Sequence, residues 1–244
     1  MIDDQKRRAG EAALAYVKEG MTVGLGTGST AEHFIKALGL EVSAGLDIKA
    51  VPTSKRSEEL ARALGIPLTE IEGANEIDVT VDGADEIDPH LTLIKGGGGA
   101  LLREKIVAAA SQQMIVIADA SKKVDILGKF PLPIEIVRFG IAATTEHIFW
   151  TLRDHGVEPE WVRLRETNGT NPAPVITDSG NLIIDCGCGA IRDAEELSLA
   201  ISAIAGVVEH GLFIRLASMA LIGTQMGVET LTPGYQPPPK VQVR

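Results

Sequence analysis

The sequence predicts an α/β protein whose main domain is a mostly parallel sheet covered by helices on both faces. Short apolar segments alternate with segments of helical periodicity through the first half of the chain, and this alternation is typical of parallel sheets. The chain has 244 residues, a length that suits one large or two modest domains, and 45% of them are hydrophobic. The 26 glycines indicate many tight turns or sites lined by backbone.

The first elements form a helix, strand and helix in succession. Apolar residues at helical spacing predict a helix over 4–19, and Gly20 is placed to end it. A short strand over 21–25 leads into the glycine turn 24–28. The next helix is expected to open at Ser29, because Ser29 to Glu32 matches a capping box.

The same alternation continues to residue 118. The sequence predicts a strand over 48–51, a helix over 54–64 ended by Gly65, and apolar stretches over 66–71 and 77–81. A helix over 100–112 and a strand over 114–118 follow. Such strands pair in parallel and need helices on both faces.

After residue 131 the rhythm changes. Strands are expected over 134–137, 161–165, 175–177, 182–185 and 207–213, and helices over 144–155 and 193–204. With the hairpin strands counted as one arm, the order is βαββαβ, that of a ferredoxin-like split-βαβ domain. We therefore predict a smaller α+β domain inserted at 132–206 into a main domain of 1–131 and 207–231. Two strands within 219–231 should return to the main sheet, and the proline-rich tail 232–244 should be mobile.

The net charge of −10 disfavours nucleic acid and anionic lipid surfaces as partners. No apolar run approaches the ~18 residues that span a bilayer, and the first eight residues lead into no signal segment, so we expect a cytoplasmic protein without membrane contact. Cys186 and Cys188 are too close for ordinary disulfide geometry and are expected as free thiols. The five histidines show no ligand spacing, so no metal site is expected.

The turn GLGTGST at 24–30 is the first candidate site. Its glycines let backbone N–H groups face an anion, the following helix N-terminus adds partial positive charge, and Ser29 and Thr30 supply hydroxyls. It matches neither a P-loop nor a dinucleotide fingerprint. A monophosphate site and a plain tight turn are both open on this evidence.

The segment VDGADEID at 81–88 places four carboxylates just beyond an apolar strand, where parallel sheets bind ligands. Surface solvation and cation binding are alternatives, although the spacing fails the EF-hand pattern. An acid/base role is favoured because one turn holds Asp82 and Asp85, and paired carboxylates can separate their proton affinities.

Four consecutive glycines follow Lys95 in KGGGGALLREK at 95–105. Each costs roughly 0.5–1 kcal/mol relative to alanine in regular structure, which favours close approach of a ligand over chance. Glu104 is expected in the first turns of the following helix, on a side that can face this loop. The segment ADASKK at 118–123 again follows a strand and offers Lys122, although lysine pairs are usually solvated. Together the four segments favour one crevice at the strand ends.

In this order, the strings GLGTGST, VDGADEID, KGGGGALLREK and ADASKKVDILGKFPLPIEI resemble the type A ribose-5-phosphate isomerase family, over about residues 1–231. The resemblance implies a Rossmann-like domain with an inserted α+β domain, and a homodimer or homotetramer. It also implies interconversion of ribose 5-phosphate and ribulose 5-phosphate through an enediolate, in the pentose phosphate pathway, without metal or organic cofactor.

Carried over residue by residue, the resemblance makes Glu104 the proton acceptor. It implies that substrate is bound by Thr27, Gly28, Ser29, Thr30, Asp82, Gly83, Ala84, Asp85, Lys95, Gly96, Gly97, Gly98 and Lys122. Lys95 is the expected oxyanion donor, and Asp82 or Asp85 is expected to move protons among the hydroxyls and help open the sugar ring.

Two other classes of protein compete with this interpretation. A sugar-phosphate sensor would need a DNA-binding segment, for which the residues before the first helix leave no room. A related enzyme, such as a sugar-phosphate deaminase, a lactonase or a coenzyme A transferase, would be separated by its substrates.

Overall fold

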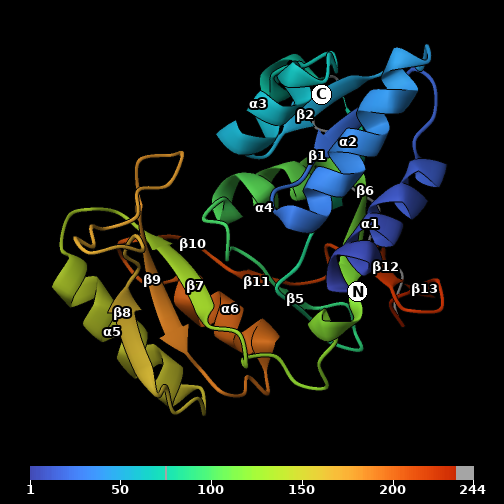
Figure 1. The fold of residues 1–244 in the computed structure, drawn as a ribbon. Coiled ribbons are helices and arrows are strands. Elements are labelled where there is room, and N and C mark those ends of the chain that lie inside the picture. Colours follow the sequence, from blue (N-terminus) through green and yellow to red (C-terminus); the bar gives the residue numbers. More distant parts are fainter. Residues whose placement is uncertain (75, 235–244) are drawn as a thin grey trace. The chain divides into compact units, whose positions relative to one another are not determined.

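The computed structural model describes residues 1–74 and 76–234. The chain forms two compact units (Figure 1). Unit 1 consists of Met1–Gly83, Arg103–Lys122 and the chain from Arg215 onward, and unit 2 of Ala84–Leu102 and Lys123–Ile214. The chain therefore passes between the units four times, and three of these passages lie inside predicted site motifs.

Unit 1 is built on a six-stranded sheet in the order β13-β12-β6-β3-β1-β2. All neighbours are parallel except β12 and β13, which form an antiparallel pair at one edge. The strands are β1 Thr22–Leu25, β2 Lys49–Pro52, β3 Ile77–Asp82, β6 Ser111–Asp119, β12 Met219–Gly223 and β13 Val228–Leu231. The predicted parallel sheet, and the return of the last two strands to it, are confirmed.

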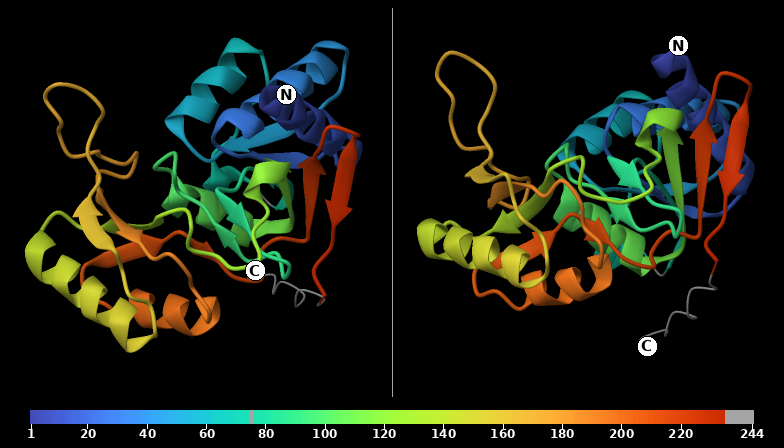
Figure 2. Two further views of the ribbon diagram at one scale, coloured as in Figure 1. Left: turned by 60° about the horizontal axis from the view of Figure 1, so that its bottom comes forward. Right: turned by 90° about the horizontal axis from the view of Figure 1, so that it is seen from below.

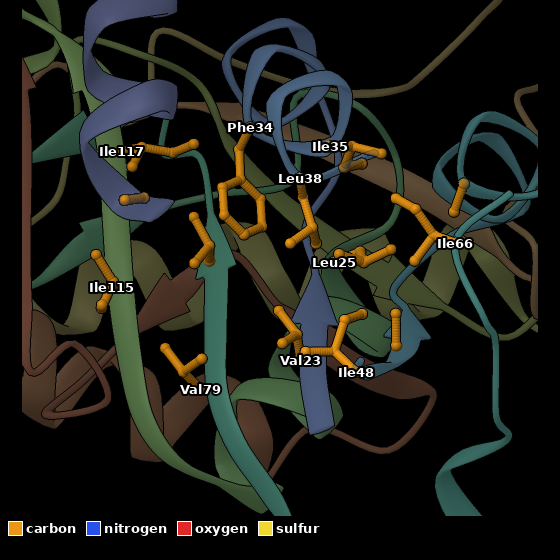
Figure 3. Close-up of a cluster of buried hydrophobic side chains, with 14 of the residues drawn as sticks. Val23, Leu25, Phe34, Ile35, Leu38, Ile48, Ile66, Val79, Ile115 and Ile117 are labelled. Carbon is orange, nitrogen blue, oxygen red and sulfur yellow. The ribbon is translucent and has the colours of Figure 1, made fainter. Parts of the chain in front are cut away.

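The helices of unit 1 bury apolar faces against this sheet. They are α1 Ile2–Ala13, α2 Ser29–Ser43, α3 Lys55–Ala63 and α4 Leu101–Ala110, of which α4 begins in unit 2, with 3-10 turns at Leu14–Tyr16, Ile71–Gly73 and Ala120–Lys122. Figure 3 shows Phe34 and Leu38 of α2 pointing toward the sheet, in which β1 carries Val23 and Leu25. These side chains are fully buried, so their burial fixes α2 on the face of β1.

A close approach of backbones positions α1 against α2. A Cβ atom on Gly10 would lie 2.8 Å from the backbone nitrogen of Phe34, so glycine is required where the two helices meet. The contact holds the start of α1 beside the start of α2. That arrangement matters for the site, because Lys6 lies on α1.

Unit 2 contains a four-stranded antiparallel sheet in the order β10-β7-β9-β8. Its strands are β7 Leu132–Ile136, β8 Trp161–Leu164, β9 Leu182–Gly187 and β10 Val207–His210, and its helices are α5 Ile141–Asp154 and α6 Ala194–Ser202. Both helices lie side by side on one face of the sheet (Figure 2). The order β7-α5-β8-β9-α6-β10 is the predicted βαββαβ arrangement, so the predicted fold class is confirmed.

A three-stranded sheet in unit 2, in the order β11-β5-β4, was not predicted. Its strands, β4 Glu86–Ile87, β5 Leu93–Ile94 and β11 Leu212–Phe213, have two residues each, too few to show a period. The predicted strand over 207–213 is therefore wrong, because it divides into β10 and β11 at Gly211. Gly211 donates its N–H to the carbonyl of Pro133 on β7, and its own carbonyl accepts the N–H of Lys95, which follows β5. The chain therefore leaves the four-stranded sheet and enters the three-stranded sheet at Gly211.

Three further local predictions are wrong. The first helix ends at Ala13, and the chain is extended by Val17, where Tyr16 and Val17 pack on the core instead of continuing the helix to residue 19. No strand forms over 175–177, because Thr177 and Asn181 turn to donate to the buried carboxylate of Glu135. The capping box at Ser29 is absent, as described with the site.

Residues 132–206, the predicted inserted domain, all lie in unit 2, which also takes in 84–102, 123–131 and 207–214. Unit 2 is larger than the predicted inserted domain, because it also contains β4, β5, β11 and their loops. The predicted tail 232–244 lies mostly outside the described residues. Among the helices that the structure describes, none is long and apolar enough to cross a membrane.

Candidate active site

Four parallel neighbours of unit 1 end at the same edge of the sheet. Strands β1, β2, β3 and β6 end at Leu25, Pro52, Asp82 and Asp119. The carboxyl ends of parallel strands form the ligand-binding edge of α/β sheets. Three of the four predicted motifs, those that contain Thr27, Asp82 and Lys122, therefore meet this edge.

The turn after β1 is shaped by contact with Asp82. Gly26 donates its N–H to the carbonyl of Val81 at 2.9 Å. A Cβ on Gly26 would lie 2.2 Å from Oδ1 of Asp82 and 2.5 Å from its Cα, so no larger residue fits without backbone movement. The glycine is thus explained by the close passage of β1 and β3.

The side chain of Thr27 joins the ends of two strands. Its Oγ1 donates to Oγ of Ser54 at 2.7 Å and lies 2.8 Å from Oγ1 of Thr53. Thr53 and Ser54 follow β2 directly and are buried. These hydroxyls form a polar floor beneath the turn, and they were missed by the sequence analysis although they follow a predicted strand.

The N-terminus of α2 has no side-chain cap. Gly28 is the N-cap residue, with φ of +108°, a conformation that favours glycine. Ser29 is consequently the first helical residue rather than the cap, and the predicted capping box is wrong. The amides of this 15-residue helix and its macrodipole are therefore available to an anion.

A cation also stands at this helix start. The ammonium of Lys6 on α1 donates to Oγ of Ser29 at 2.9 Å, and Ser29 itself is exposed. Sequence analysis missed Lys6, because a lysine on the polar face of a helix is usually solvated. Its signal is three-dimensional and depends on the packing of α1 on α2.

Asp82 is fully buried at the end of β3. Its Oδ1 accepts the N–H of Thr27 at 3.0 Å and the N–H of Gly83 at 2.7 Å. One carboxylate oxygen therefore fixes the turn after β1 to the turn after β3. The Asp82 side chain therefore stabilises the conformation of these two turns.

Glu104 is buried, at 4% exposure, in the first turn of α4. Its neighbours Arg103 and Lys105 are both partly exposed. A carboxylate in the first turn of a helix is stabilised by the helix dipole. The sequence predicts Glu104 within the first turns of this helix, which is confirmed, and its orientation toward the glycine loop stays a prediction.

Lys122 ends the 3-10 turn that follows β6. The turn is held by buried Asp119, whose Oδ1 accepts from the N–H of Ser121 at 3.0 Å and from its hydroxyl at 2.5 Å. Lys122 is partly exposed. It adds a second cation to the strand-end edge of unit 1.

The glycine loop that follows β5 belongs to unit 2. The N–H of Gly97 donates to Oδ2 of Asp85 at 2.8 Å, and a Cβ on Gly97 would lie 2.7 Å from Oδ1 of Asp85. Gly96 and Gly99 have φ of +105° and +78°. Two of the four consecutive glycines thus serve backbone conformation and a third serves the approach to Asp85.

Lys95 is one of the largest fully buried side chains of the protein. Its ammonium lies 5.4 Å from the centre of the Phe213 ring, within the range of a cation–π contact. Its backbone N–H donates to Gly211. Burial of a lysine is costly unless its charge is compensated, so this position is typical of a functional cation.

The other two carboxylates of the second motif hold loops. Glu86 is buried and accepts the N–H groups of Gly128 at 2.7 Å and Phe130 at 2.6 Å. Oδ1 of Asp88 accepts the N–H groups of His90 and Thr92, both at 2.8 Å. Asp82 and Asp85 also accept loop N–H groups, each through one carboxylate oxygen, whereas both oxygens of Glu86 are occupied by such bonds.

Cys186 and Cys188 are free thiols, as predicted, and both are buried. Burial raises the pKa of the Cys186 thiol well above its usual range, and it raises the pKa of Cys188 to about 12. In the described part of the chain, no three His, Cys, Asp or Glu residues are grouped to hold a metal ion.

The chain is similar to proteins of one known family. Residues 49–227 match the family model of ribose 5-phosphate isomerase A (phosphoriboisomerase A). Ribose-5-phosphate isomerase A of Parvibaculum lavamentivorans is 55% identical over 229 residues, which are 94% of this chain and 98% of that protein. The Caulobacter vibrioides protein of the same name is 52% identical over 95% of this chain and 99% of its own length.

Solved structures give the same result. Ribose 5-phosphate isomerase from Plasmodium falciparum superposes with a TM-score of 0.88 at 40% identity, covering 96% of this chain and all of that one. A D-ribose-5-phosphate isomerase in complex with phospho-erythronic acid has a TM-score of 0.88 at 39% identity, covering 95% of this chain and 99% of that one.

Proposed function

The chain belongs to the ribose 5-phosphate isomerase A family, and we propose that it interconverts D-ribose 5-phosphate and D-ribulose 5-phosphate by proton transfer through an enediolate. The observation that carries the proposal is the strand-end edge of unit 1. There an uncapped helix start with a lysine suits a phosphate, and buried carboxylates supply the acid/base groups.

The phosphate binds at the start of α2. Backbone amides of 28–30 and the hydroxyls of Ser29 and Thr30 donate to its oxygens, while Lys6 and Lys122 supply positive charge. When the phosphate binds, the ammonium of Lys6 either exchanges its hydrogen bond to Ser29 for one to the phosphate or keeps it and binds both. Thr27 orients the turn through its contact with Ser54.

Glu104 takes the proton from C2 of the ring-opened aldose. The electron pair of that C–H bond forms the C1–C2 double bond, and the carbonyl electrons move to O1 to give the enediolate. Glu104 then returns the proton to C1, and a carbonyl forms at C2. Burial of Glu104 keeps the transferred proton from bulk solvent for part of each cycle.

Lys95 stabilises the enediolate oxygens, because a buried ammonium interacts strongly with a developing negative charge. Asp82 or Asp85 moves the proton from O2 to O1 and assists ring opening. The backbone of Gly83, Ala84, Gly96, Gly97 and Gly98 contacts the substrate hydroxyls. Substrate and product are isomers, so these steps together consume no oxidant, reductant or co-substrate.

The test is conversion of ribose 5-phosphate by the purified protein after treatment with EDTA. We expect formation of ribulose 5-phosphate up to the same equilibrium ratio from either sugar. Activity that disappears with EDTA and returns with a divalent cation would contradict a metal-free proton transfer. Binding of ribose 5-phosphate without turnover would instead favour a sensor.

We further propose that the protein assembles as a homodimer or homotetramer and acts in the cytoplasm, as the family resemblance implies. Light scattering coupled to size-exclusion chromatography tests the first proposal, since a monomeric mass at micromolar concentration contradicts it. Cell fractionation tests the second.

A further inference from the structure

We propose that Arg165 is a positioning residue for the glycine loop, and that its guanidinium, anchored on Asp185, fixes the backbone of Gly96 and Gly97 for catalysis. The proposal deepens the proposed function and rests on it for its kinetic consequences. All the contacts that carry it lie within unit 2.

The anchor is a two-point ion pair. Nε of Arg165 donates to Oδ2 of Asp185 at 2.8 Å, and Nη2 donates to Oδ1 at 2.5 Å. Both side chains are 15% exposed, so solvent screens the pair only in part. Parallel donation to both carboxylate oxygens sets the plane of the guanidinium as well as its position.

The backbone beneath this side chain is also fixed. The N–H of Arg165 donates to the carbonyl of Ile183 at 2.7 Å, and its carbonyl accepts the N–H of Val175 at 2.9 Å. Asp185 lies on β9, in the middle of the four-stranded sheet. The backbone and the guanidinium of Arg165 are therefore both bonded to β9.

The remaining nitrogen of the guanidinium reaches the glycine loop. Nη1 of Arg165 donates to the carbonyl of Gly96 at 2.8 Å and to the carbonyl of Gly97 at 3.2 Å. Gly97 in turn donates its N–H to the carboxylate of Asp85. A continuous series of hydrogen bonds thus runs from Asp185 through Arg165 and Gly97 to Asp85.

The glycine loop 96–99 needs contacts from other residues to hold one backbone conformation. Glycine has more backbone freedom than any other residue, so four in succession order themselves poorly. Gly97 and Gly98 are exposed and have no side chains to pack. The loop depends on contacts from outside, and two carbonyl contacts from one guanidinium meet that need.

Arginine is suited to this task and lysine is not. A guanidinium offers five N–H donors in a fixed plane, so it can bind a carboxylate with one edge and carbonyls with another. A lysine ammonium can satisfy the charge of Asp185 but has no rigid second edge. The substitution Arg165→Lys therefore separates charge from geometry.

The experiment compares Arg165→Ala and Arg165→Lys with Arg163→Ala. Arg163 lies two residues earlier on β8, directly across from Asp185 in the strand register, and its guanidinium is 4.1 Å from the Trp161 ring centre. Arg163→Ala therefore removes a positive charge beside the same carboxylate while keeping the bonds from Arg165 to the loop, which makes it a matched control. For each variant, kcat and KM are measured with and without added guanidinium at non-denaturing concentration. Amide hydrogen exchange of Gly97 and Gly99 is measured without substrate.

We expect Arg165→Ala to lower kcat by about 10-fold to 100-fold, because small displacements of a positioned group cost about this much. Guanidinium should restore part of the loss, and exchange at Gly97 and Gly99 should accelerate. Arg165→Lys should fold and show a smaller loss of kcat with accelerated exchange. Arg163→Ala should match the wild type in all three measurements.

Wild-type kcat and wild-type loop exchange in a folded Arg165→Lys or Arg165→Ala variant would overturn the proposal. A loss of thermal stability with unchanged kcat per folded molecule and no guanidinium rescue would also overturn it, since that is the result of a merely structural role. The exchange measurement needs no turnover, so it stands if the wild type proves not to isomerise ribose 5-phosphate.

Discussion

The two glycine loops of the molecule, 26–30 in unit 1 and 96–99 in unit 2, reach their order by different means. The first loop lies between parallel strands and a helix, and its contacts come from residues at the ends of neighbouring strands, such as Asp82, the last residue of β3, and Thr53, which follows β2. The second loop is held by single side chains, Asp85 and Arg165, the latter 68 residues away in sequence from Gly97.

The two loops therefore differ in how strongly their conformation depends on single side chains. A loop between parallel strands takes its shape from the sheet, and changes in one side chain are shared among many backbone contacts. A run of glycines takes its shape from the few groups that bind it. We therefore expect substitutions near the first loop to affect stability, and substitutions near the second to affect turnover.

The largest effect is expected from Glu104→Gln, which removes the proposed base and keeps its size. Loss of a positioned general base lowers kcat by about 100-fold to 10,000-fold. Binding of ribose 5-phosphate, measured by calorimetry, should stay within a few-fold of wild type, because the amide fills the same space. A variant with near wild-type kcat would remove Glu104 from its proposed role.

The next largest effect contrasts Gly26→Ala with Gly97→Ala. In Gly26→Ala the new Cβ meets the Cα of Asp82 at 2.5 Å, which only backbone movement relieves. Overpacking of this kind costs about 1–3 kcal/mol of unfolding free energy, measured by urea titration. In Gly97→Ala the new Cβ meets the carboxylate end of Asp85 at 2.7 Å, and a flexible end can move.

Gly97→Ala should therefore unfold at nearly the wild-type urea concentration while its kcat falls, because the displaced carboxylate of Asp85 is a proposed proton carrier. Equal losses of stability in the two variants would refute the distinction between the loops. So would a Gly97→Ala enzyme with unchanged kcat.

A smaller effect is expected from Lys6→Met, which removes one cation from the proposed phosphate site. KM should rise about fivefold to tenfold, equivalent to roughly 1–1.4 kcal/mol, with little change in kcat. The matched control is Arg7→Met on the same helix. The ion pairs of Arg7 are with Asp4 and Glu11 of its own helix, so its removal should leave KM unchanged. Equal KM changes in both variants would indicate a general charge effect.

The smallest effect concerns Cys186 and Cys188, which provide an inert reference for both loops. The thiolate is the reactive form, and burial raises the pKa of Cys188 to about 12. At pH 8 the native protein should react with a thiol reagent hardly at all, whereas the protein in urea should take up two equivalents. Rapid labelling of native protein would show that this part of unit 2 opens.

Much of the fold follows from the sequence, because parallel strands and amphipathic helices carry periodic patterns. Strands β1 and β3 begin within about one residue of their predicted starts, whereas β6 begins at Ser111 rather than at 114 and the first helix ends at Ala13 rather than at 19. The sheet of β4, β5 and β11 could not be predicted, since pairs of residues carry no period. Ser29 fails as a cap because Gly28 takes a positive φ, which the capping pattern does not encode.

The candidate site divides in the same way. Burial of Asp82, Lys95 and Glu104 agrees with their selection from strand ends and the glycine motif, while their chemical roles stay predictions. Lys6 and Arg165 could not be found, because each acts through a residue distant in sequence, Ser29 and Gly96 respectively. Contacts of single side chains across the fold leave no local pattern.

The measurement that tests the central claim most directly is hydrogen exchange at carbon, followed by NMR, during reaction in deuterium oxide. If Glu104 carries a proton between C2 and C1, repeated conversion to equilibrium should replace the C2 hydrogen of ribose 5-phosphate by deuterium. Glu104→Gln should not catalyse the exchange. Retention of that hydrogen through many turnovers, or unchanged exchange in Glu104→Gln, would contradict proton transfer through Glu104.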